Sequence, residues 1–582
     1  MLTSCPEAAE QSVNPTNGAG GTRWAVLVGL TIFAVSYGAY SMVALDYRSL
    51  TNDLGAQFYL SKITSEGAVP LVDFQHGWNA GSWWLGALLY RMAGGDPTLW
   101  AFLWSRLFGE CLAAVLVAGI ALRQRLPPAA MVAMALGVLT LVSPGHMKYA
   151  LPVVWVFLLL PSPWIDRGRT RLIVGFVAPL ILFWVHVELA ILLTAGAVLF
   201  ELVGRHDARL GSRALHSLAL GAGLVSGLVT EALFYLLGYG MSITELNRQV
   251  VFGQAREFPK HFGWPFFDVP TDNASYMVVA LFPAVLLLPF VPVVWRQLSD
   301  PTRFVALSAL CLATIAIRRP GPGHSTTVGA LVLVALVLVV SELAPRWSVV
   351  SWSVRRHGAF LGVLVAGVEA LVGAAWAVVA IKVGFGTDSF AGPVVLIVTV
   401  LAAVVATRFL APHVLVASLG ALLVIATYPV VAAIDRVGDI MREDEPFTMA
   451  DRLSTAIKPE LGRCLGGSHE ALIVPTVLPM YDRLAVENPT PYYLFWYDFG
   501  RNQQQVEADF RSGRVPVVIA PTALPNHPWM IKSLRENYRR CARVNIVEGR
   551  HTVDIWTHTS REPFEKRVLT VRADGGVTYD RS

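Results

Sequence analysis

The residues of most chemical interest follow the first long apolar segment, in the run Asn52-Asp53-Leu54-Gly55-Ala56-Gln57-Phe58-Tyr59. A carboxylate such as Asp53, in the first loop outside a membrane, can accept the proton of an incoming hydroxyl group. Asp46, at the exit of the apolar segment, is a second candidate for this proton transfer. Each has a simpler alternative. Asp53 can cap a helix that begins at Leu54, and Asp46 can be an ordinary acidic residue at the interface.

A dense polar group follows in the same loop. Asp73, Gln75, His76 and Asn79 stand between two segments with helical patterns. Such a group can orient a substrate through hydrogen bonds, or it can be part of the loop structure. Both interpretations stay open.

Two groups of basic residues are candidates for binding a phosphate. Arg318 and Arg319 stand at the outer end of an apolar segment, where the positive-inside rule does not require them. The planar guanidinium group can donate two parallel hydrogen bonds to a phosphate. His324 follows at a distance that a Pro/Gly turn can fold back, and His146 and Lys148 form a second group on the same face. The alternative is that these side chains extend to lipid headgroups.

A third group, Trp184, His186 and Glu188, lies where two short apolar segments meet at the outer face. Ionisable groups at membrane depth are costly and are therefore functional candidates. The alternative is a His–Glu pair that satisfies its own hydrogen bonds inside the protein.

The composition predicts a membrane protein. Of 582 residues, 54% are apolar and only 15% are charged, and the mean hydropathy is +0.53, outside the range of soluble globular proteins. The net charge of +5 is explained by topology and gives no reason to expect nucleic acid as a partner. Apolar stretches long enough to cross about 30 Å of hydrocarbon recur along the chain.

The apolar pattern predicts about 11–13 transmembrane helices. They are placed near 24–44, 98–122, 129–143, 150–164, 172–185, 188–203, 217–238, 276–295, 304–317, 326–343, 359–383, 393–407 and 413–433. On this path one side collects Arg23, Arg123, Arg125, Arg167, Arg169, Arg171, Arg205, Arg209, Arg213, Arg296, Arg303, Arg346, Arg355, Arg356 and Arg408. The positive-inside rule makes that side cytoplasmic. The N-terminus is then cytoplasmic and the C-terminal region extracytoplasmic.

Three regions follow from this path. Residues 1–22 form a polar, disordered cytoplasmic tail, and residues 23–433 form the transmembrane domain. Its first external loop, 46–95, holds an amphipathic piece (Leu54, Phe58 and Ile63 against Gln57, Lys62 and Glu66) and an aromatic piece at 78–90 suited to the membrane interface. In residues 434–582 charges are spread evenly, with strands at 471–474 and 517–520 and helices at 502–512 and 527–540. This pattern predicts an extracytoplasmic α/β domain.

Cysteine usage fits this topology. Cys111 and Cys311 fall in predicted spans and are interpreted as packing residues. Cys464 and Cys541 both fall in the C-terminal domain, where an oxidising environment permits a disulfide. The sequence does not supply the distance that such a bond requires. Zinc-finger spacings, a Walker loop and a G-x-G-x-x-G fingerprint are absent from the sequence.

These features together resemble the GT-C superfamily of membrane glycosyltransferases, near protein mannosyltransferases and lipid A glycosyltransferases. The resemblance rests on Asp53 beyond the first span and on Gly67-Ala68-Val69-Pro70-Leu71-Val72-Asp73-Phe74, with Leu71 where Tyr is usual. It also rests on Arg319-Pro320-Gly321-Pro322-Gly323-His324. Many members carry paired acids where this chain has Asn52-Asp53, so dependence on a divalent metal (Mg²⁺ or Mn²⁺) is left open and no cofactor is certain.

The resemblance implies an activity. The enzyme would move a sugar from a polyprenyl-phosphate donor to a glycan, lipid or protein acceptor at the outer face of a bacterial plasma membrane. It assigns Asp53 as the general base, with Asp46 as the substitute. The phosphate would be bound by Arg318, Arg319, His324, His146 and Lys148, and the substrates by Asp73, Gln75, His76, Asn79, His186 and Glu188.

Two other classes remain as alternatives. A transporter or a flippase of lipid-linked sugars would also cross the membrane many times, but usually with inverted repeats and helices broken at matching positions. The sequence shows no such symmetry. The second alternative is a non-catalytic protein of cell-envelope assembly, in which the first loop could be varied without loss of function.

Overall fold

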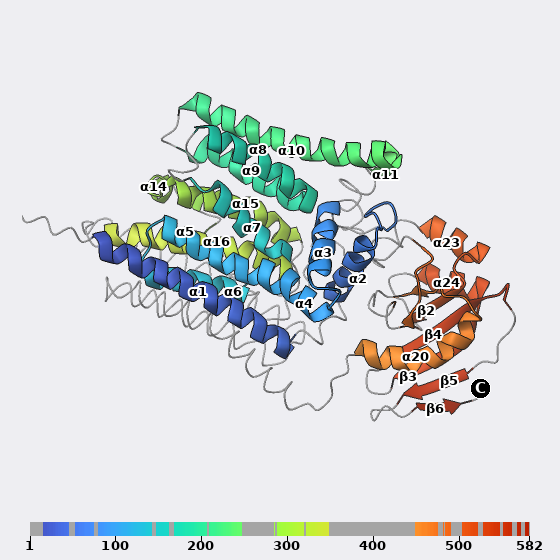
Figure 1. The fold of residues 1–582 in the computed structure, drawn as a ribbon. Helices are drawn as coiled ribbons and strands as arrows, with labels where there is room; N and C mark the ends of the chain where they lie inside the picture. Colours follow the sequence, from blue (N-terminus) through green and yellow to red (C-terminus); the bar gives the residue numbers. More distant parts are fainter. Residues whose placement is uncertain are drawn as a thin grey trace, which may run out of the picture.

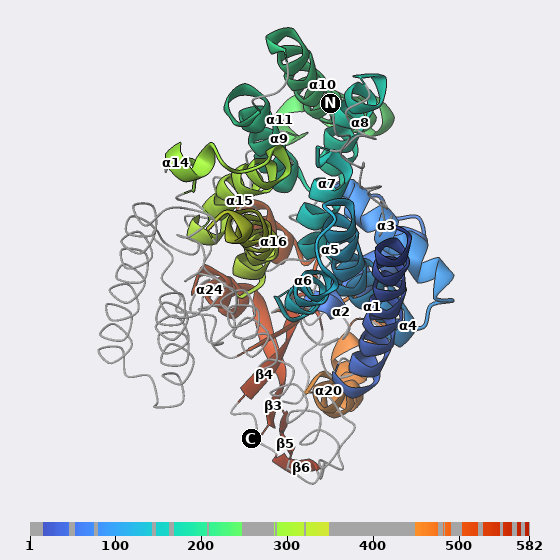
Figure 2. The ribbon, with the colours of Figure 1, turned by 90° about the vertical axis from the view of Figure 1, so that its left-hand side faces the viewer.

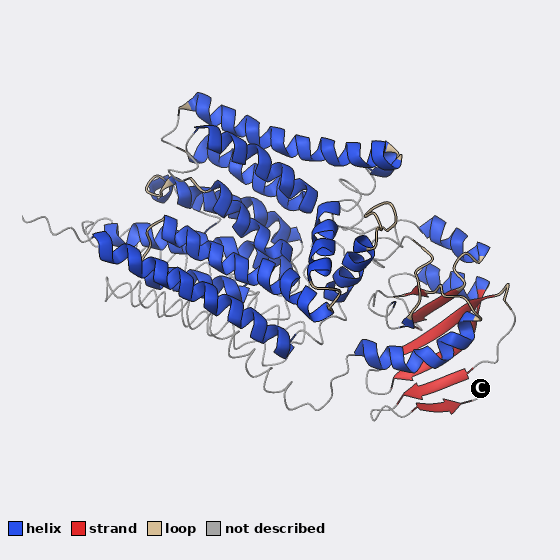
Figure 3. Ribbon diagram, viewed as in Figure 1, coloured by secondary structure: helices blue, strands red, loops and turns tan. Residues whose placement is uncertain are grey.

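The computed structural model describes residues 16–45, 53–74, 79–141, 147–161, 168–205, 209–246, 285, 288–290, 292–318, 322–347, 449–474, 481, 484–490, 503–521, 528–546, 551–561, 567–571 and 577–580. Within these residues the N-terminal part is helical and the strands lie in the C-terminal part (Figure 3). The spans predicted at 359–383, 393–407 and 413–433, most of the one at 276–295 and the domain boundary at 433/434 lie outside the described residues.

The helices of the N-terminal part are labelled in Figure 1. In chain order they are α1 (Thr16–Leu45), α2 (Asp53–Ser65), α3 (Ala80–Met92), α4 (Pro97–Ala101), the π-helix η2 (Phe102–Cys111), α5 (Leu112–Arg123), α6 (Pro128–Leu141), the 3-10 helix η3 (Met147–Ala150), α7 (Leu151–Leu159), α8 (Gly168–Val185), α9 (Val187–Leu199), the π-helix η4 (Phe200–Gly204), α10 (Leu210–Tyr239), α11 (Ile243–Leu246), the 3-10 helix η6 (Leu288–Phe290), α14 (Pro292–Trp295), α15 (Asp300–Arg318) and α16 (Pro322–Trp347).

The predicted spans from 24–44 to 217–238, and those at 304–317 and 326–343, coincide with described helices. Because α1 begins at Thr16, residues 16–22 of the predicted tail are helical. Within the described residues, five helical segments are long and apolar enough to cross a membrane: Gly21–Ala39, Pro97–Arg123, Gly168–Val185, Val187–Gly204 and Leu210–Tyr239. The chain is therefore a multi-pass membrane protein by the length and composition of its helices.

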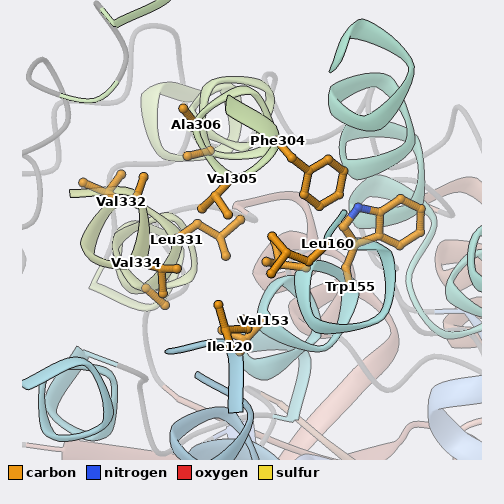
Figure 4. Close-up of a cluster of buried hydrophobic side chains, with 14 of the residues drawn as sticks. Ile120, Val153, Trp155, Leu160, Phe304, Val305, Ala306, Leu331, Val332 and Val334 are labelled. Carbon is orange, nitrogen blue, oxygen red and sulfur yellow. The ribbon is translucent and has the colours of Figure 1, made fainter. Parts of the chain in front are cut away.

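The long helices form a bundle. Figure 2, which looks along the bundle, shows α8, α9 and α10 on one side, α1, α5 and α6 on the other, and α7, α15 and α16 between them. The main hydrophobic core fills this middle region, where Ile120, Val153, Phe304 and Leu331 come together (Figure 4). These side chains come from α5, α7, α15 and α16, so the core joins helices that are far apart in the sequence.

Glycines allow α8 and α10 to approach closely. A Cβ atom added at Gly223 would lie 2.1 Å from the carbonyl oxygen of Phe176, and one at Gly227 would lie 2.6 Å from the Cβ of Phe183. Small residues at such a contact let two membrane helices pack backbone to backbone. This pair of helices also carries Trp184, in α8, and Glu231, in α10.

Gly223→Ala is expected to destabilise the protein by about 1–3 kcal/mol, because the added methyl group meets backbone that cannot move independently. Gly221→Ala in the same helix is the matched control, since a Cβ there meets nothing within 4 Å. The control should be neutral or slightly stabilising, because alanine favours helix over glycine. Thermal unfolding of the purified protein in detergent measures both variants. Equal unfolding midpoints would contradict this account of the contact.

The C-terminal part is a sheet with helices on both faces. Its helices are α20 (Met449–Leu465), α23 (Gln503–Ser512) and α24 (Pro528–Asn537), and its strands are β1 (Leu472–Ile473), β2 (Val517–Pro521), β3 (Tyr538–Ile546), β4 (His551–His558), β5 (Arg567–Val571) and β6 (Val577–Asp580). Within the described residues six strands form one sheet in the order β1-β2-β4-β3-β5-β6. β1 pairs with β2, and β3 with β5, in parallel. The other neighbours are antiparallel.

The strands have two buried faces. Side chains alternate along a strand, so Val517 and Ile519 of β2 face the cluster that contains α20, whereas Val518 and Ala520 face α23 and α24. A strand buried on both faces is a continuous apolar run. The strand predicted at 517–520 is confirmed as β2, and the strand predicted at 471–474 is confirmed over the two residues of β1. The helix predicted at 527–540 is too long. It ends at Asn537, where β3 begins with a residue whose ring packs in the core.

Cys464 and Cys541 form a disulfide, with their Cα atoms 6.0 Å apart. Cys464 lies at the end of α20, and Cys541 lies at a bulge of β3, between Arg540 and Ala542. The bond therefore fixes α20 against the sheet. Since the cysteines are 77 residues apart, it stabilises the fold by about 4 kcal/mol in the chain-entropy account.

Candidate functional site

Both helices predicted in the first loop are formed. α2 begins at Asp53, one residue earlier than predicted, and α3 begins at Ala80. The two helices pack against each other at the end of the bundle nearer the sheet (Figure 1). Asp46, Gln75 and His76 lie outside the described residues, and of Asp53 the structure describes the backbone.

The amphipathic interpretation of α2 is wrong at Gln57, whereas Glu66 is exposed as predicted and Lys62 is half-buried. Gln57 is buried, and its side-chain oxygen accepts a hydrogen bond from the indole N–H of Trp104 in η2. Ser61 is buried against α3, where a Cβ at Gly86 would lie 2.2 Å from its hydroxyl oxygen. Gln57 and Ser61 are buried because η2 and α3 pack against α2. Its position is therefore fixed by packing.

The turn between α2 and α3 is held by the Asp73 carboxylate, whose Oδ2 accepts a hydrogen bond from the backbone N–H of Val69 at 2.6 Å. The Asp73 side chain is exposed. Leu71, in the position where the related motif has Tyr, has a φ of 69° and is buried next to Tyr235 of α10. A non-glycine residue with a positive φ is uncommon, so contacts with neighbouring residues must stabilise Leu71 in this backbone conformation.

Asn79 connects three helices. Its side-chain N–H group donates to both carboxylate oxygens of Glu231 in α10, at 3.2 and 2.9 Å, and its oxygen accepts from the backbone N–H of Val187 at 3.0 Å. Glu231 also accepts a hydrogen bond from the backbone N–H of Ala80. Both side chains are buried. A carboxylate at the first turn of a helix is favourable because it faces unpaired N–H groups and the positive end of the helix dipole. Glu231 thus caps α3 from another helix.

The group predicted at 184–188 lies beside this connection. Trp184 donates from its indole N–H to the hydroxyl of Thr230 at 2.9 Å, and its ring packs on Trp84 of α3. His186 precedes α9, and its Nδ1 accepts from the backbone N–H of Leu189 at 3.4 Å. Glu188 is in the first turn of α9, and both side chains are half-buried. Asn79 therefore contacts the segment that carries His186 and Glu188, 108 residues later in the sequence, through the backbone N–H of Val187.

A buried ion pair lies in η2, the π-helix that contacts α2 through Trp104. Arg106 Nη1 lies 2.7 Å from Glu110 Oε1, and both side chains are nearly inaccessible. Arg106, Glu110 and Glu231 are not among the site residues predicted from the sequence, although each stands out there as an ionisable residue in an otherwise apolar run.

The elements that carry the predicted phosphate ligands are linked to η2 through η3. Lys148 lies in η3 and is half-buried, and η3 packs against both η2 and α16. His324 lies in the first turn of α16, and Arg318 is the last residue of α15, which packs along α16. Arg319, His146 and the side chains of Arg318 and His324 lie outside what the structure describes.

The other ends of α8 and α10 hold a second buried charge cluster. The carboxylate of Glu201 in η4 pairs with Arg171 of α8, and its Oε1 lies 3.1 Å from Nδ1 of His216 in α10. Arg303 pairs with Asp300 at 3.3 Å. Arg171 and Arg303 are among the residues predicted to mark the cytoplasmic side. Both are buried: the Glu201 carboxylate pairs with Arg171, and Arg303 also donates to the backbone carbonyl groups of Trp295 and Gly204.

The sequence leaves metal dependence open, and the described side chains hold no metal site. Among the side chains that the structure describes, no three His, Cys, Asp or Glu residues come together as metal ligands would. Asp46 and the side chain of Asp53 are not among those side chains, so the question of a Mg²⁺ or Mn²⁺ ion at this loop stays open.

Neither a family model nor a curated protein matches this chain. Among solved structures, the chain is similar to ArnT from Cupriavidus metallidurans in the apo state, with 15% identity, a TM-score of 0.46, and coverage of 92% of this chain and 98% of that chain. It is also similar to ArnT from Cupriavidus metallidurans bound to undecaprenyl phosphate, with 14% identity, a TM-score of 0.47, and coverage of 92% and 99%. At this identity and TM-score, the likeness assigns neither a substrate nor a catalytic residue to this chain.

Proposed function

We propose that this protein is a membrane glycosyltransferase that moves a sugar from a polyprenyl-phosphate donor to an acceptor of the cell envelope. It acts at the outer face of the plasma membrane, on the side of α2, α3 and the C-terminal domain, with the N-terminus in the cytoplasm. Asp53 is the general base. The proposal rests on this chain's own residues. Undecaprenyl phosphate, which is bound in one of the similar structures, belongs to the proposed class of lipid.

One observation carries the proposal. α2, which begins with Asp53, and η3, which contains Lys148, both pack on the π-helix η2. η3 in turn packs on α16, whose first turn contains His324. Asp53, Lys148 and His324, from distant parts of the sequence, thus belong to elements that are linked through η2 and η3, which supports the proposal. Sugar transfer from a phosphate needs this combination of a base and phosphate-binding cations.

The proposed reaction breaks one bond and forms one. The acceptor hydroxyl oxygen attacks the anomeric carbon, and its proton passes to the Asp53 carboxylate. The bond between that carbon and the phosphate oxygen breaks, and the polyprenyl phosphate departs with the electron pair. Arg318, Arg319, His324 and Lys148 stabilise the charge that develops on the phosphate. His186 and Glu188 orient the substrates, and Asn79 holds the same end of the bundle together through Glu231 and the backbone of Val187.

Mass spectrometry of lipid-linked sugars and envelope glycans in a strain that lacks the protein tests this function. A transferase predicts accumulated donor together with a shortened glycan or an unmodified acceptor. A flippase predicts donor that is trapped in the inner leaflet, which labelling of outer-leaflet sugars by a membrane-impermeant reagent would detect. Unchanged glycans and donor pools would exclude both a transferase and a flippase function, and a role in cell-envelope assembly would remain.

Arg318→Ala and Arg319→Ala are expected to raise the Michaelis constant for the donor by about tenfold to a hundredfold, because each removes a charge-assisted hydrogen bond to phosphate. The Michaelis constant for the acceptor should change little. Arg296→Ala is the matched control, since its exposed side chain lies near the opposite end of α15. Steady-state kinetics with purified protein measures these constants. A donor constant equal to that of the wild type would remove these arginines from the phosphate site.

A further inference from the structure

The C-terminal domain and the first loop share one buried hydrophobic cluster. Tyr59 and Leu60 of α2, Phe74 of the turn and Trp83 of α3 belong to it. The C-terminal domain contributes residues of α20, β1, β2 and β3 to the same cluster, among them Ile457, Leu461, Ile473, Val517 and Val544. The helix that begins with Asp53 is therefore covered by a domain that follows it by about four hundred residues.

Tyr481 makes the direct contact. Its ring stacks on the ring of Tyr59, with centroids 5.5 Å apart and an interplanar angle of 28°. Its hydroxyl oxygen accepts a hydrogen bond from the backbone N–H of Ile473 in β1 at 2.9 Å. Tyr481 is 1% exposed and Tyr59 is 6% exposed, so each ring is fixed. Tyr481 thus extends from the sheet to the surface of α2.

The contact between Tyr481 and Tyr59 lies close to the start of α2, where Asp53 stands. Tyr59 lies six residues after Asp53, about 9 Å along the helix axis. α2 is held on its other side by Gln57, through Trp104 of η2. A helix held at two nearby points on different sides can neither tilt nor rotate freely. The disulfide Cys464–Cys541 fixes α20, which contributes to the same cluster, against the sheet.

We propose that the C-terminal domain is part of the catalytic apparatus, because Tyr481 is a positioning residue that holds α2 where Asp53 meets the acceptor. This inference rests on the proposed function. It distinguishes the domain from one that only binds an acceptor or a partner protein. A misplacement of about 1 Å at a reacting group can lower a rate by about a hundredfold, so a contact that fixes the helix affects kcat rather than substrate binding.

The test uses Tyr481→Ala and Tyr59→Ala in the full-length purified protein. Each variant is expected to lower kcat by about tenfold to a hundredfold, with the donor Michaelis constant within about twofold of the wild type. The double variant should lose no more than the worse single variant, because both remove one contact. Tyr481→Phe should keep most of kcat, since the ring stack remains. Unchanged kcat in Tyr481→Ala would overturn the inference.

Leu534→Ala is the matched control for domain stability. Leu534 is fully buried in the cluster on the opposite face of the sheet, away from α2. With assays below the unfolding temperature of every variant, Leu534→Ala should keep kcat within about twofold. If it lowers kcat as much as Tyr481→Ala does, the effect is one of domain stability and the inference is wrong.

Amide hydrogen exchange separates this inference from the proposed function. Exchange of residues 54–65 should be at least tenfold faster in Tyr481→Ala than in the wild type, whether or not the protein transfers sugar. If the wild-type protein has no transferase activity but Tyr481→Ala still speeds exchange, the proposed function is contradicted and the contact between Tyr481 and α2 is supported. Unchanged exchange in an active enzyme would contradict the positioning role alone.

Discussion

Asp53→Asn is expected to lower kcat for sugar transfer by about 10²–10⁴-fold, the usual contribution of a general base. Asparagine keeps the size and shape of the side chain and cannot accept the hydroxyl proton. α2 is fixed by Gln57, Ser61 and Tyr59 rather than by its first residue, so the variant should fold like the wild type. Steady-state rates with purified protein and saturating donor measure the effect.

Asp96→Asn supplies the matched control. Asp96 belongs to the segment that closes the first loop, and its Oδ1 caps α4 by accepting from the backbone N–H of Leu99 at 2.7 Å. Asparagine caps helices about as well as aspartate, so this variant should keep full activity and stability. If Asp53 only caps α2, Asp53→Asn will behave like Asp96→Asn. A near-normal kcat in both variants would therefore remove Asp53 from the mechanism.

Asn79→Ala is expected to destabilise the protein by about 2–4 kcal/mol. The change leaves the partly buried N–H of Val187 without its acceptor and the buried carboxylate of Glu231 with fewer donors, and unsatisfied buried groups are costly. Thermal unfolding in detergent measures the loss. The connection joins α3 to α9 and α10, so it should also loosen the first loop, which faster hydrogen exchange of residues 80–92 would reveal.

Glu231→Gln and the double variant Asn79→Ala/Glu231→Ala complete the test. Glutamine keeps an oxygen acceptor for Asn79 and Ala80, so Glu231→Gln should lose less than half as much as Asn79→Ala. The double variant removes both partners, and its loss should be smaller than the sum of the losses in Asn79→Ala and in the single variant Glu231→Ala. Strictly additive losses would show that Asn79 and Glu231 do not support each other.

Sequence patterns predict the elements of this fold well. Runs of apolar residues mark the spans from 24–44 to 217–238, and two-faced burial produces the continuous strands at 471–474 and 517–520. The two helices of the first loop were also predicted. The overlong helix at 527–540 shows the limit, because Tyr538 and its neighbours fit a strand as well as a helix until the pairing with β4 decides.

Tertiary contacts explain what the patterns missed. Gln57 has a polar side chain at a helical position that favours a surface, but an indole N–H from η2 satisfies it in the interior. Glu231 caps α3 from a helix about 150 residues away in the chain, and no local signal identifies that partner. The stack of Tyr59 on Tyr481 likewise depends on how two regions dock. Hydrophobic periodicity in a sequence indicates whether a residue is buried, but it does not identify the residue that packs against it.

The central claim is that this chain transfers a lipid-linked sugar and that Asp53 removes the acceptor's proton. The most direct measurement is the ratio of accumulated lipid-linked donor to finished glycan, by mass spectrometry, in a deletion strain that expresses wild-type protein, Asp53→Asn or Asp96→Asn at equal levels. The account predicts that wild type and Asp96→Asn restore the normal ratio, whereas Asp53→Asn leaves the ratio of the deletion strain. Restoration by Asp53→Asn would contradict it.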